Sequence, residues 1–231
     1  MLVRQLTKQL SRTLNTALSG IADAITEVFI DLSPTSEEFY SLGSPITFAG
    51  DFEFEFEISS TMTGNGIILG DSSGLDSFVN IHNTGGVLRV TLLGVNTYST
   101  ARVNTGKLEK IRGVKTGSTF YLYINGTLDT TSTGLSSGSV TFDRVGRFNS
   151  TSSLMFDGII SDVKLTDLTT PANSLEFKLD QLTASTETNN GVTLTYQNIG
   201  TGTDVRDTYT LSNGNTQWIS DLRTIDIAAQ A

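Results

Sequence analysis

The sequence predicts a mostly β protein, an antiparallel β-sandwich preceded by an amphipathic α-helix. Two observations carry this prediction. Short runs of alternating apolar and polar residues recur through most of the chain, and turns rich in Gly, Asn and Ser separate them. Residues 1–30 show instead apolar positions that are three and four residues apart. The length of 231 residues suits one sandwich with its own core.

Residues 1–34 are predicted to form a docking and oligomerisation helix with its linker, and a break is expected at Ser33-Pro34. Polar residues interrupt the apolar stripe, which argues against a secretory signal peptide. The near-heptad spacing favours contact with another subunit, so we expect a homo-oligomer, for example a trimer. The alternative is a helix packed on its own sandwich. The stripe consists of Val3, Leu6, Leu10, Leu14, Ala17, Ile21 and Val28.

Residues 35–170 carry the predicted sandwich. In the run 46–59, Phe52, Phe54 and Phe56 alternate with glutamates, so one face is expected in the core and the other in solvent. The later predicted strands are 66–69, 77–82, 87–93, 96–103, 107–115, 118–124, 139–148 and 154–166.

Two stretches are more specific than the rest. In residues 120–129 an alternating strand leads into Asn125-Gly126, a pair typical of a tight hairpin turn. In residues 156–167, "Phe-Asp-Gly-Ile-Ile-Ser-Asp-Val" begins a strand whose apolar residues share one face. Together these stretches resemble the paired signatures of laminin-G-like, concanavalin A-like jelly-roll domains. The resemblance covers roughly residues 45 to 168 and implies a binding module.

Residues 171–231 are predicted as a C-terminal β appendage packed on the jelly roll, with the last strands of the same sheet as the alternative. The stretch 173–201, which begins Asn-Ser-Leu-Glu-Phe-Lys-Leu-Asp, resembles in layout the C-terminal portion of tailed-bacteriophage structural proteins. This resemblance implies a virion surface protein, made in the host cytoplasm, that contacts other virion proteins and host envelope polysaccharide. A purely structural connector or decoration protein is the alternative.

Candidate binding residues are sought in polar turns and among the tyrosines. The glycan-binding candidates are Asp71, Asp76, Tyr98 and Asn149. A calcium site at the same rim would also use Asp157. Asp and Ser beside Gly are ordinary turn residues, so no metal and no other cofactor is expected.

A jelly-roll glycoside hydrolase is the enzymatic alternative, because Glu53, Glu55 and Glu57 share one face of a strand. A solvated outer face explains the same spacing. We therefore expect no enzymatic activity.

The composition excludes several other classes. The net charge is −9, and no Lys/Arg stripe exists to neutralise a phosphate backbone, so nucleic-acid binding is not expected. Cysteine is absent, and His82 is the only histidine, which excludes thiolate and multi-histidine metal sites. No apolar run approaches the roughly 20 residues that a membrane-spanning helix needs, so no membrane insertion is expected.

Overall fold

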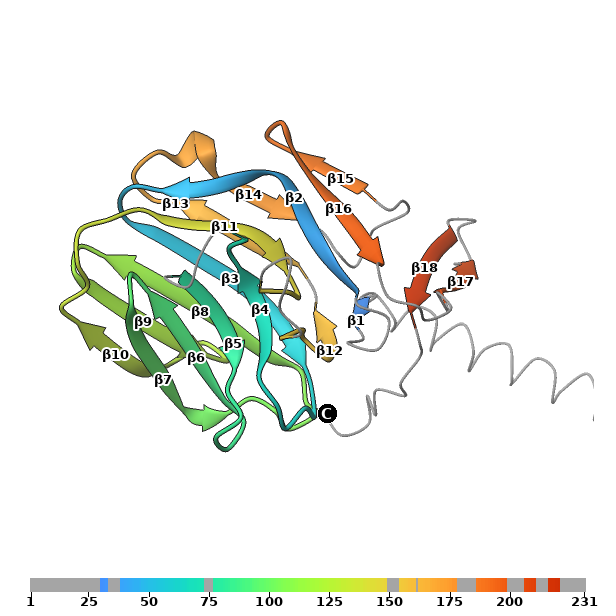
Figure 1. Ribbon diagram of the computed structural model, residues 1–231, viewed down its shortest axis with the longest axis horizontal. Coiled ribbons are helices and arrows are strands. Elements are labelled where there is room, and N and C mark those ends of the chain that lie inside the picture. Colours follow the sequence, from blue (N-terminus) through green and yellow to red (C-terminus); the bar gives the residue numbers. More distant parts are fainter. Residues whose placement is uncertain are drawn as a thin grey trace, which may run out of the picture.

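The protein is an antiparallel sandwich of two β-sheets (Figure 1). The computed structural model describes residues 30–32, 38–72, 77–148, 154–160, 162–177, 186–198, 206–210 and 216–220. The first sheet, here called the β3 sheet, has the order β1 (Ile30–Leu32), β12 (Gly158–Ile160), β3 (Phe52–Ser59), β8 (Glu109–Thr116), β9 (Thr119–Ile124) and β10 (Thr127–Thr133). In the same sheet, β13 (Val163–Asp167) pairs with β3 and with β14 (Leu175–Phe177).

The second sheet, here called the β2 sheet, faces the first. Its order is β15 (Thr186–Asn189), β16 (Val192–Asn198), β2 (Glu38–Phe48), β11 (Val140–Val145), β4 (Gly66–Gly70), β5 (Ser77–Ile81), β6 (Val87–Leu92) and β7 (Val95–Arg102). A separate hairpin joins β17 (Arg206–Thr210) to β18 (Thr216–Ser220), and a short 3₁₀ turn, η1 (Pro171–Asn173), lies between β13 and β14. The expected antiparallel sandwich of two sheets is thus present, and its arrangement is consistent with a jelly roll.

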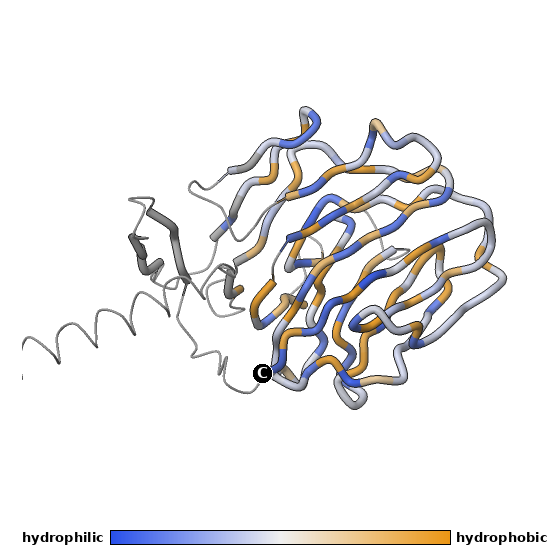
Figure 2. The backbone as a smooth tube through the Cα atoms, turned by 180° about the vertical axis from the view of Figure 1, so that it is seen from behind, coloured by the Kyte–Doolittle hydropathy of each residue, from blue (hydrophilic) through white to orange (hydrophobic). Residues whose placement is uncertain are grey.

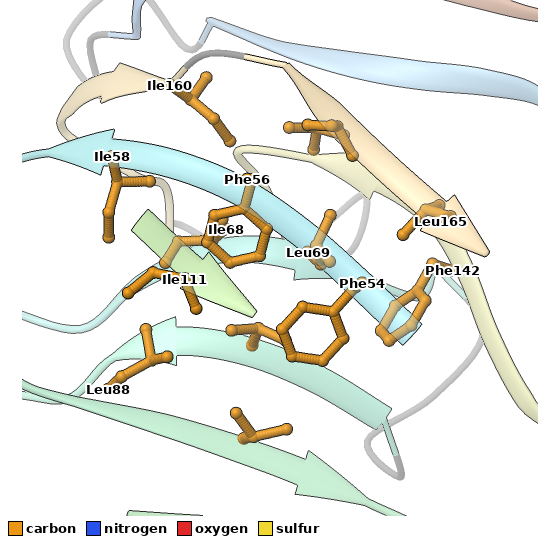
Figure 3. Close-up of a cluster of buried hydrophobic side chains, with 14 of the residues drawn as sticks. Phe54, Phe56, Ile58, Ile68, Leu69, Leu88, Ile111, Phe142, Ile160 and Leu165 are labelled. Carbon is orange, nitrogen blue, oxygen red and sulfur yellow. The ribbon is translucent and has the colours of Figure 1, made fainter. Parts of the chain in front are cut away.

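The core lies between the sheets and contains most of the phenylalanines. Figure 2 shows apolar and polar positions alternating along many strands, and Figure 3 shows the inward side chains of both sheets meeting. In β3 the predicted alternation is confirmed, because Phe52, Phe54 and Phe56 are buried while the intervening glutamates are half-buried. Phe52 stacks on Phe48 with 4.7 Å between ring centroids, and Phe54 stacks on Phe56 at 5.7 Å.

The hairpin predicted at Asn125-Gly126 joins β9 to β10. Both residues have positive φ angles, 51° and 77°, as a two-residue hairpin turn requires. The Asn125 side chain strengthens the turn: its Oδ1 accepts from the Lys110 backbone N–H at 2.9 Å, and its Nδ2 donates to Glu109 at 2.6 Å. The turn role of Asn125 therefore has a direct structural basis.

The start of the sandwich differs from the sequence-based expectation. The run 46–59 was predicted as one strand, but β2 ends at Phe48, and β3 begins at Phe52 after a turn. Strand β2 also begins earlier, at Glu38, in a stretch that contains Gly43 and Pro45 and lacks clean alternation. It is a strand because β16 and β11 pair with it on either side, which no local pattern reveals.

Residues 171–198 continue the sandwich where the structure describes them. Strand β14 pairs with β13, and β16 pairs with β2, so both sheets gain strands from the predicted appendage. These strands follow the alternative arrangement, in which the tail supplies the last strands of the same sheets. The division into three domains stays a prediction. In the predicted segment 1–34 the structure describes Ile30–Leu32, which form β1 and pair with β12, so this part belongs to the β3 sheet and is neither helix nor linker. The helix predicted for the residues before it lies outside the described residues. Within the described part, no helix has the length and apolar character needed to cross a bilayer.

Candidate functional site

Strands β5, β6 and β7 have a common side that faces away from the core, buried along β5 and exposed along β7. Their alternate residues, such as Val79 and Val90, lie in the core, so the residues between them face away from it. The register places side chains from the three strands in rows, because Arg89 pairs with both Asn80 and Tyr98. We call this surface the β5–β7 face; it consists of Phe78, Asn80, His82, Arg89, Thr91, Asn96 and Tyr98.

Tyr98 is the aromatic platform of the β5–β7 face. Its exposed fraction is 43%, whereas the phenylalanines of the sandwich core are buried. The imidazole of His82 meets it edge to face, with 5.4 Å between ring centroids and an interplanar angle of 83°. A partly exposed tyrosine ring offers apolar surface for the C–H face of a sugar and a hydroxyl for hydrogen bonding.

Arg89 lies beside Tyr98 and is fixed by two contacts. Its Nε donates to Asn80 Oδ1 at 2.9 Å, and its guanidinium lies over the Phe78 ring at 4.7 Å from the centroid. Asn80 is fully buried and is itself held, because its Nδ2 donates to the Ile81 carbonyl at 2.9 Å. The fixed contacts reduce the conformational freedom that Arg89 would lose on binding a ligand.

His82 is a neutral hydrogen-bond donor at neutral pH. Burial, and secondly the positive charge of Arg89, lower the pKa of His82 below its ordinary value of 6.5. The backbone N–H of Thr84 donates to Nδ1 at 3.2 Å, which places the imidazole proton on Nε2. The ring therefore contributes an N–H donor to the β5–β7 face without adding charge.

The edge of the β5–β7 face is tied to the opposite sheet. The carboxylate of Asp129 in β10 accepts from the Thr100 backbone N–H and hydroxyl, both at 2.7 Å, and from the Ala101 N–H at 3.0 Å. These contacts hold β7 against β10, and Figure 1 shows the two strands at the same edge of the sandwich. Tyr98, two residues before Thr100, is therefore carried on an anchored strand.

Of the predicted glycan-binding residues, the structure places Tyr98 in the β5–β7 face. Asp71 follows β4 and is half-buried. It is separated from β7 by three strand spacings, or about 14 Å. Asp76 and Asn149 lie outside the described residues. Asp157 precedes β12 in the other sheet. The described residues hold no group of three or more His, Cys, Asp and Glu side chains suited to a metal ion.

The glutamates of β3 form a different surface, on the outside of the β3 sheet. Glu55 pairs with Lys110 at 3.0 Å, and Glu53 pairs with Arg112 at 2.6 Å. The hydrogen bonds to these glutamates raise the pKa values of Lys110 and Arg112. Pairs this exposed contribute about 0–1 kcal/mol each, and they give the alternating glutamates a structural explanation.

Arg89, Asn80 and His82 were not among the predicted binding residues. The sequence contains one signal that points to them: residues 77–108 include no Asp or Glu, although the chain as a whole carries 24 acidic residues and a net charge of −9. The stretch does contain Arg89, Arg102 and Lys107. Charge depletion over one stretch locates a strand group but not a face, because the register of the strands decides which side chains meet.

Comparison with solved structures shows the fold. The chain resembles a proposed carbohydrate-binding protein from Bacteroides ovatus, with a TM-score of 0.55, 18% identity, and coverage of 74% of this chain and 58% of that one. It also resembles the LG1-3 region of the laminin α2 chain, with a TM-score of 0.50, 14% identity, and coverage of 74% and 29%. The chain thus spans a little over half of the first protein and under a third of the second.

At these identities the likeness shows the fold alone, an antiparallel β-sandwich similar to those of the two proteins. No protein-family model matches the chain, and no curated protein matches it in sequence. The solved structures support the predicted fold, and they contain nothing that bears on a phage origin.

Proposed function

We propose that the protein is a carbohydrate-binding module that binds glycan on the β5–β7 face. The observation that carries this proposal is the exposed ring of Tyr98, which stands in one row with Arg89 and Asn80 and against the edge of His82. Sugar recognition needs an apolar platform for one face of the ring and fixed polar groups for its hydroxyls, and this face supplies both. The binding surface is the outer side of the last three strands of the β2 sheet, rather than the turns around Asp71 and Asn149.

The proposal predicts weak binding at each single site. Of the seven residues of the face, Asn96 and Tyr98 are exposed, whereas Phe78, Asn80 and Thr91 are buried, so a ligand has little surface to contact. A dissociation constant of about 1 mM is therefore expected. Linked copies would gain about 10²–10⁴-fold through effective concentration. Multivalent display would therefore turn a weak module into a useful adhesin.

Removal of the Tyr98 ring tests the proposal. Tyr98→Ala should weaken binding to a responsive polysaccharide about tenfold, or ~1.4 kcal/mol, while Tyr98→Phe should retain most of it. Binding is measured by isothermal titration calorimetry after a screen of bacterial and plant polysaccharides. The matched control is Tyr121→Ala, which removes a half-buried tyrosine from the outer face of the β3 sheet.

Two results would contradict the proposal. Loss of binding in Tyr121→Ala with full binding in Tyr98→Ala would move the site to the other sheet. No binding by either the single chain or an artificially linked multimer would favour the structural connector.

We further propose that residues 1–29, the part of the predicted segment 1–34 that precedes β1, attach the module to a virion and assemble it into an oligomer. This part rests on the near-heptad stripe and on the resemblance of the tail to phage structural proteins. Deletion of residues 1–29, which keeps β1, should leave a folded monomer by analytical ultracentrifugation, while the full chain is oligomeric. Unfolding of the truncated chain would show instead that the segment belongs to the core.

A further inference from the structure

The β5–β7 face is locally cationic in an acidic protein. Its three strands and the turns between them carry Arg89 and Arg102 and no carboxylate. The Arg102 guanidinium lies near the β5–β6 turn, with Nη2 4.0 Å from the position that a Cβ on Gly85 would occupy. Within the described residues no ion pair joins either arginine to an acid. The described carboxylate at the edge of the face, that of Asp129, accepts from Thr100 and Ala101 and is not paired with either arginine.

The fixed geometry of Arg89 leaves a defined set of donors. Since Nε is engaged by Asn80 and one face of the guanidinium covers Phe78, the N–H groups on the two terminal nitrogens remain for a ligand. These groups form a planar fork that matches the two oxygens of a carboxylate. The ring of Tyr98 stands on the neighbouring strand, directly opposite Arg89 in the register, where opposed Cβ atoms are about 5 Å apart.

A comparison within the molecule shows what is unusual about Arg89. Arg112 on the β3 sheet also lies over an aromatic ring, that of Tyr123, at 5.1 Å. Its guanidinium, however, is paired with Glu53 at 2.6 Å. Both arginines are stacked and oriented, but only Arg112 is supplied with a carboxylate by the described residues. Arg89 pairs in the register with Asn80 and Tyr98, neither of which carries a carboxylate.

We propose that the β5–β7 face selects glycans that carry a carboxylate, such as uronic or sialic acid residues. This inference rests on the proposed function and names the class of sugar that the site takes. The carboxylate of the sugar binds the N–H groups on the two terminal nitrogens of Arg89. The sugar ring lies against the ring of Tyr98, and the neutral His82 donates from Nε2 to a sugar hydroxyl. A dense polyanion fits less well, because the face has few cations and the protein as a whole carries a net charge of −9.

Matched glycan pairs test this class directly. Oligogalacturonate, oligomannuronate, a hyaluronan oligosaccharide and sialyllactose are each compared with their carboxyl-methyl esters by calorimetry on the full chain. At least one free acid should bind about 10- to 100-fold more tightly than its ester. Arg89→Gln should remove that difference, and Arg89→Lys should retain only part of it because an ammonium lacks the planar fork. The control, Arg112→Gln, should leave binding unchanged.

The nuclear magnetic resonance signal of His82 gives a second readout that needs no variant. A bound carboxylate favours the imidazolium, so a responsive acid should raise the pKa of His82, and its ester should not. As the chain has one histidine, the signal is unambiguous.

The outcomes separate this inference from the proposed function. If acids and esters bind equally and Tyr98→Ala still weakens both, glycan binding stands and carboxylate selection is wrong. If heparin binds as tightly as every uronate and salt abolishes all of it, the face is a nonspecific cationic patch, and the inference is also wrong. If no glycan in the polysaccharide screen or the acid panel binds, both proposals fail.

Discussion

A methyl group added at Gly113 should destabilise the core, because the residue leaves room for two phenylalanine rings. Gly113 lies in β8 opposite Phe54. A Cβ at this position would stand 2.2 Å from Phe54 Cζ and 2.8 Å from Phe120 Cζ. Both rings are fully buried, so neither can swing into solvent. One of the rings must leave its rotamer, or the sheets must separate locally.

The expected cost follows from two opposing effects. Overpacking of a dense core costs about 1–3 kcal/mol. Replacement of Gly by Ala in extended backbone recovers about 0.4–1 kcal/mol by restricting the unfolded chain. Gly113→Ala should therefore lower the free energy of unfolding by about 1–2 kcal/mol. Gly64→Ala is the matched control, because no atom lies within 4 Å of its added Cβ and it should be neutral or slightly stabilising.

A double-mutant cycle isolates the steric origin of this effect. Phe54→Ala alone should cost about 3–5 kcal/mol through lost burial and a residual cavity. In the Phe54→Ala background the cavity accepts the new methyl group, so Gly113→Ala should then cost almost nothing, and the cycle should show about 1–2 kcal/mol of coupling. Urea unfolding followed by circular dichroism measures each variant. Additive costs, or a Gly113→Ala variant as stable as the parent, would refute the reasoning.

Three further predictions concern single polar groups. Asp129→Ala should lower the free energy of unfolding by about 1–3 kcal/mol and accelerate amide hydrogen exchange in β7, since three donors lose their acceptor. Unchanged exchange in β7 would show that Asp129 does not hold this strand. Glu55→Gln should change stability by less than about 1 kcal/mol and leave glycan binding intact, and a glycan-cleaving activity lost in this variant would revive the hydrolase. The pKa of His82 should lie below 6.5 and should rise in Arg89→Gln. The contribution of His82 to folding stability is therefore complete above pH 6.5 and declines as the pH falls through the lowered pKa. A pKa above 6.5 in a proton titration would contradict this electrostatic account.

Local patterns in the sequence were sufficient for the class of fold and for several of its elements. Alternation identified the core face of β3, and Asn125-Gly126 identified the β9–β10 hairpin, because side-chain period and turn conformation depend on neighbours in the chain. Tyr98 was likewise a candidate, because tyrosine can form an aromatic platform for a sugar. Such properties are readable because the physics that sets them acts over a few residues.

The tertiary structure alone decided which distant residues meet. Strand β2 owes its full length to pairing with β16, some 150 residues away in the chain, and no alternation marks its first half. The row of Asn80, Arg89 and Tyr98 exists because hydrogen-bonded register aligns three strands, and a shift of one residue would turn one of these side chains into the core. Register and strand order are set by packing between the sheets and by pairing across long loops. A binding surface assembled from several strands therefore becomes visible only when the chain is folded.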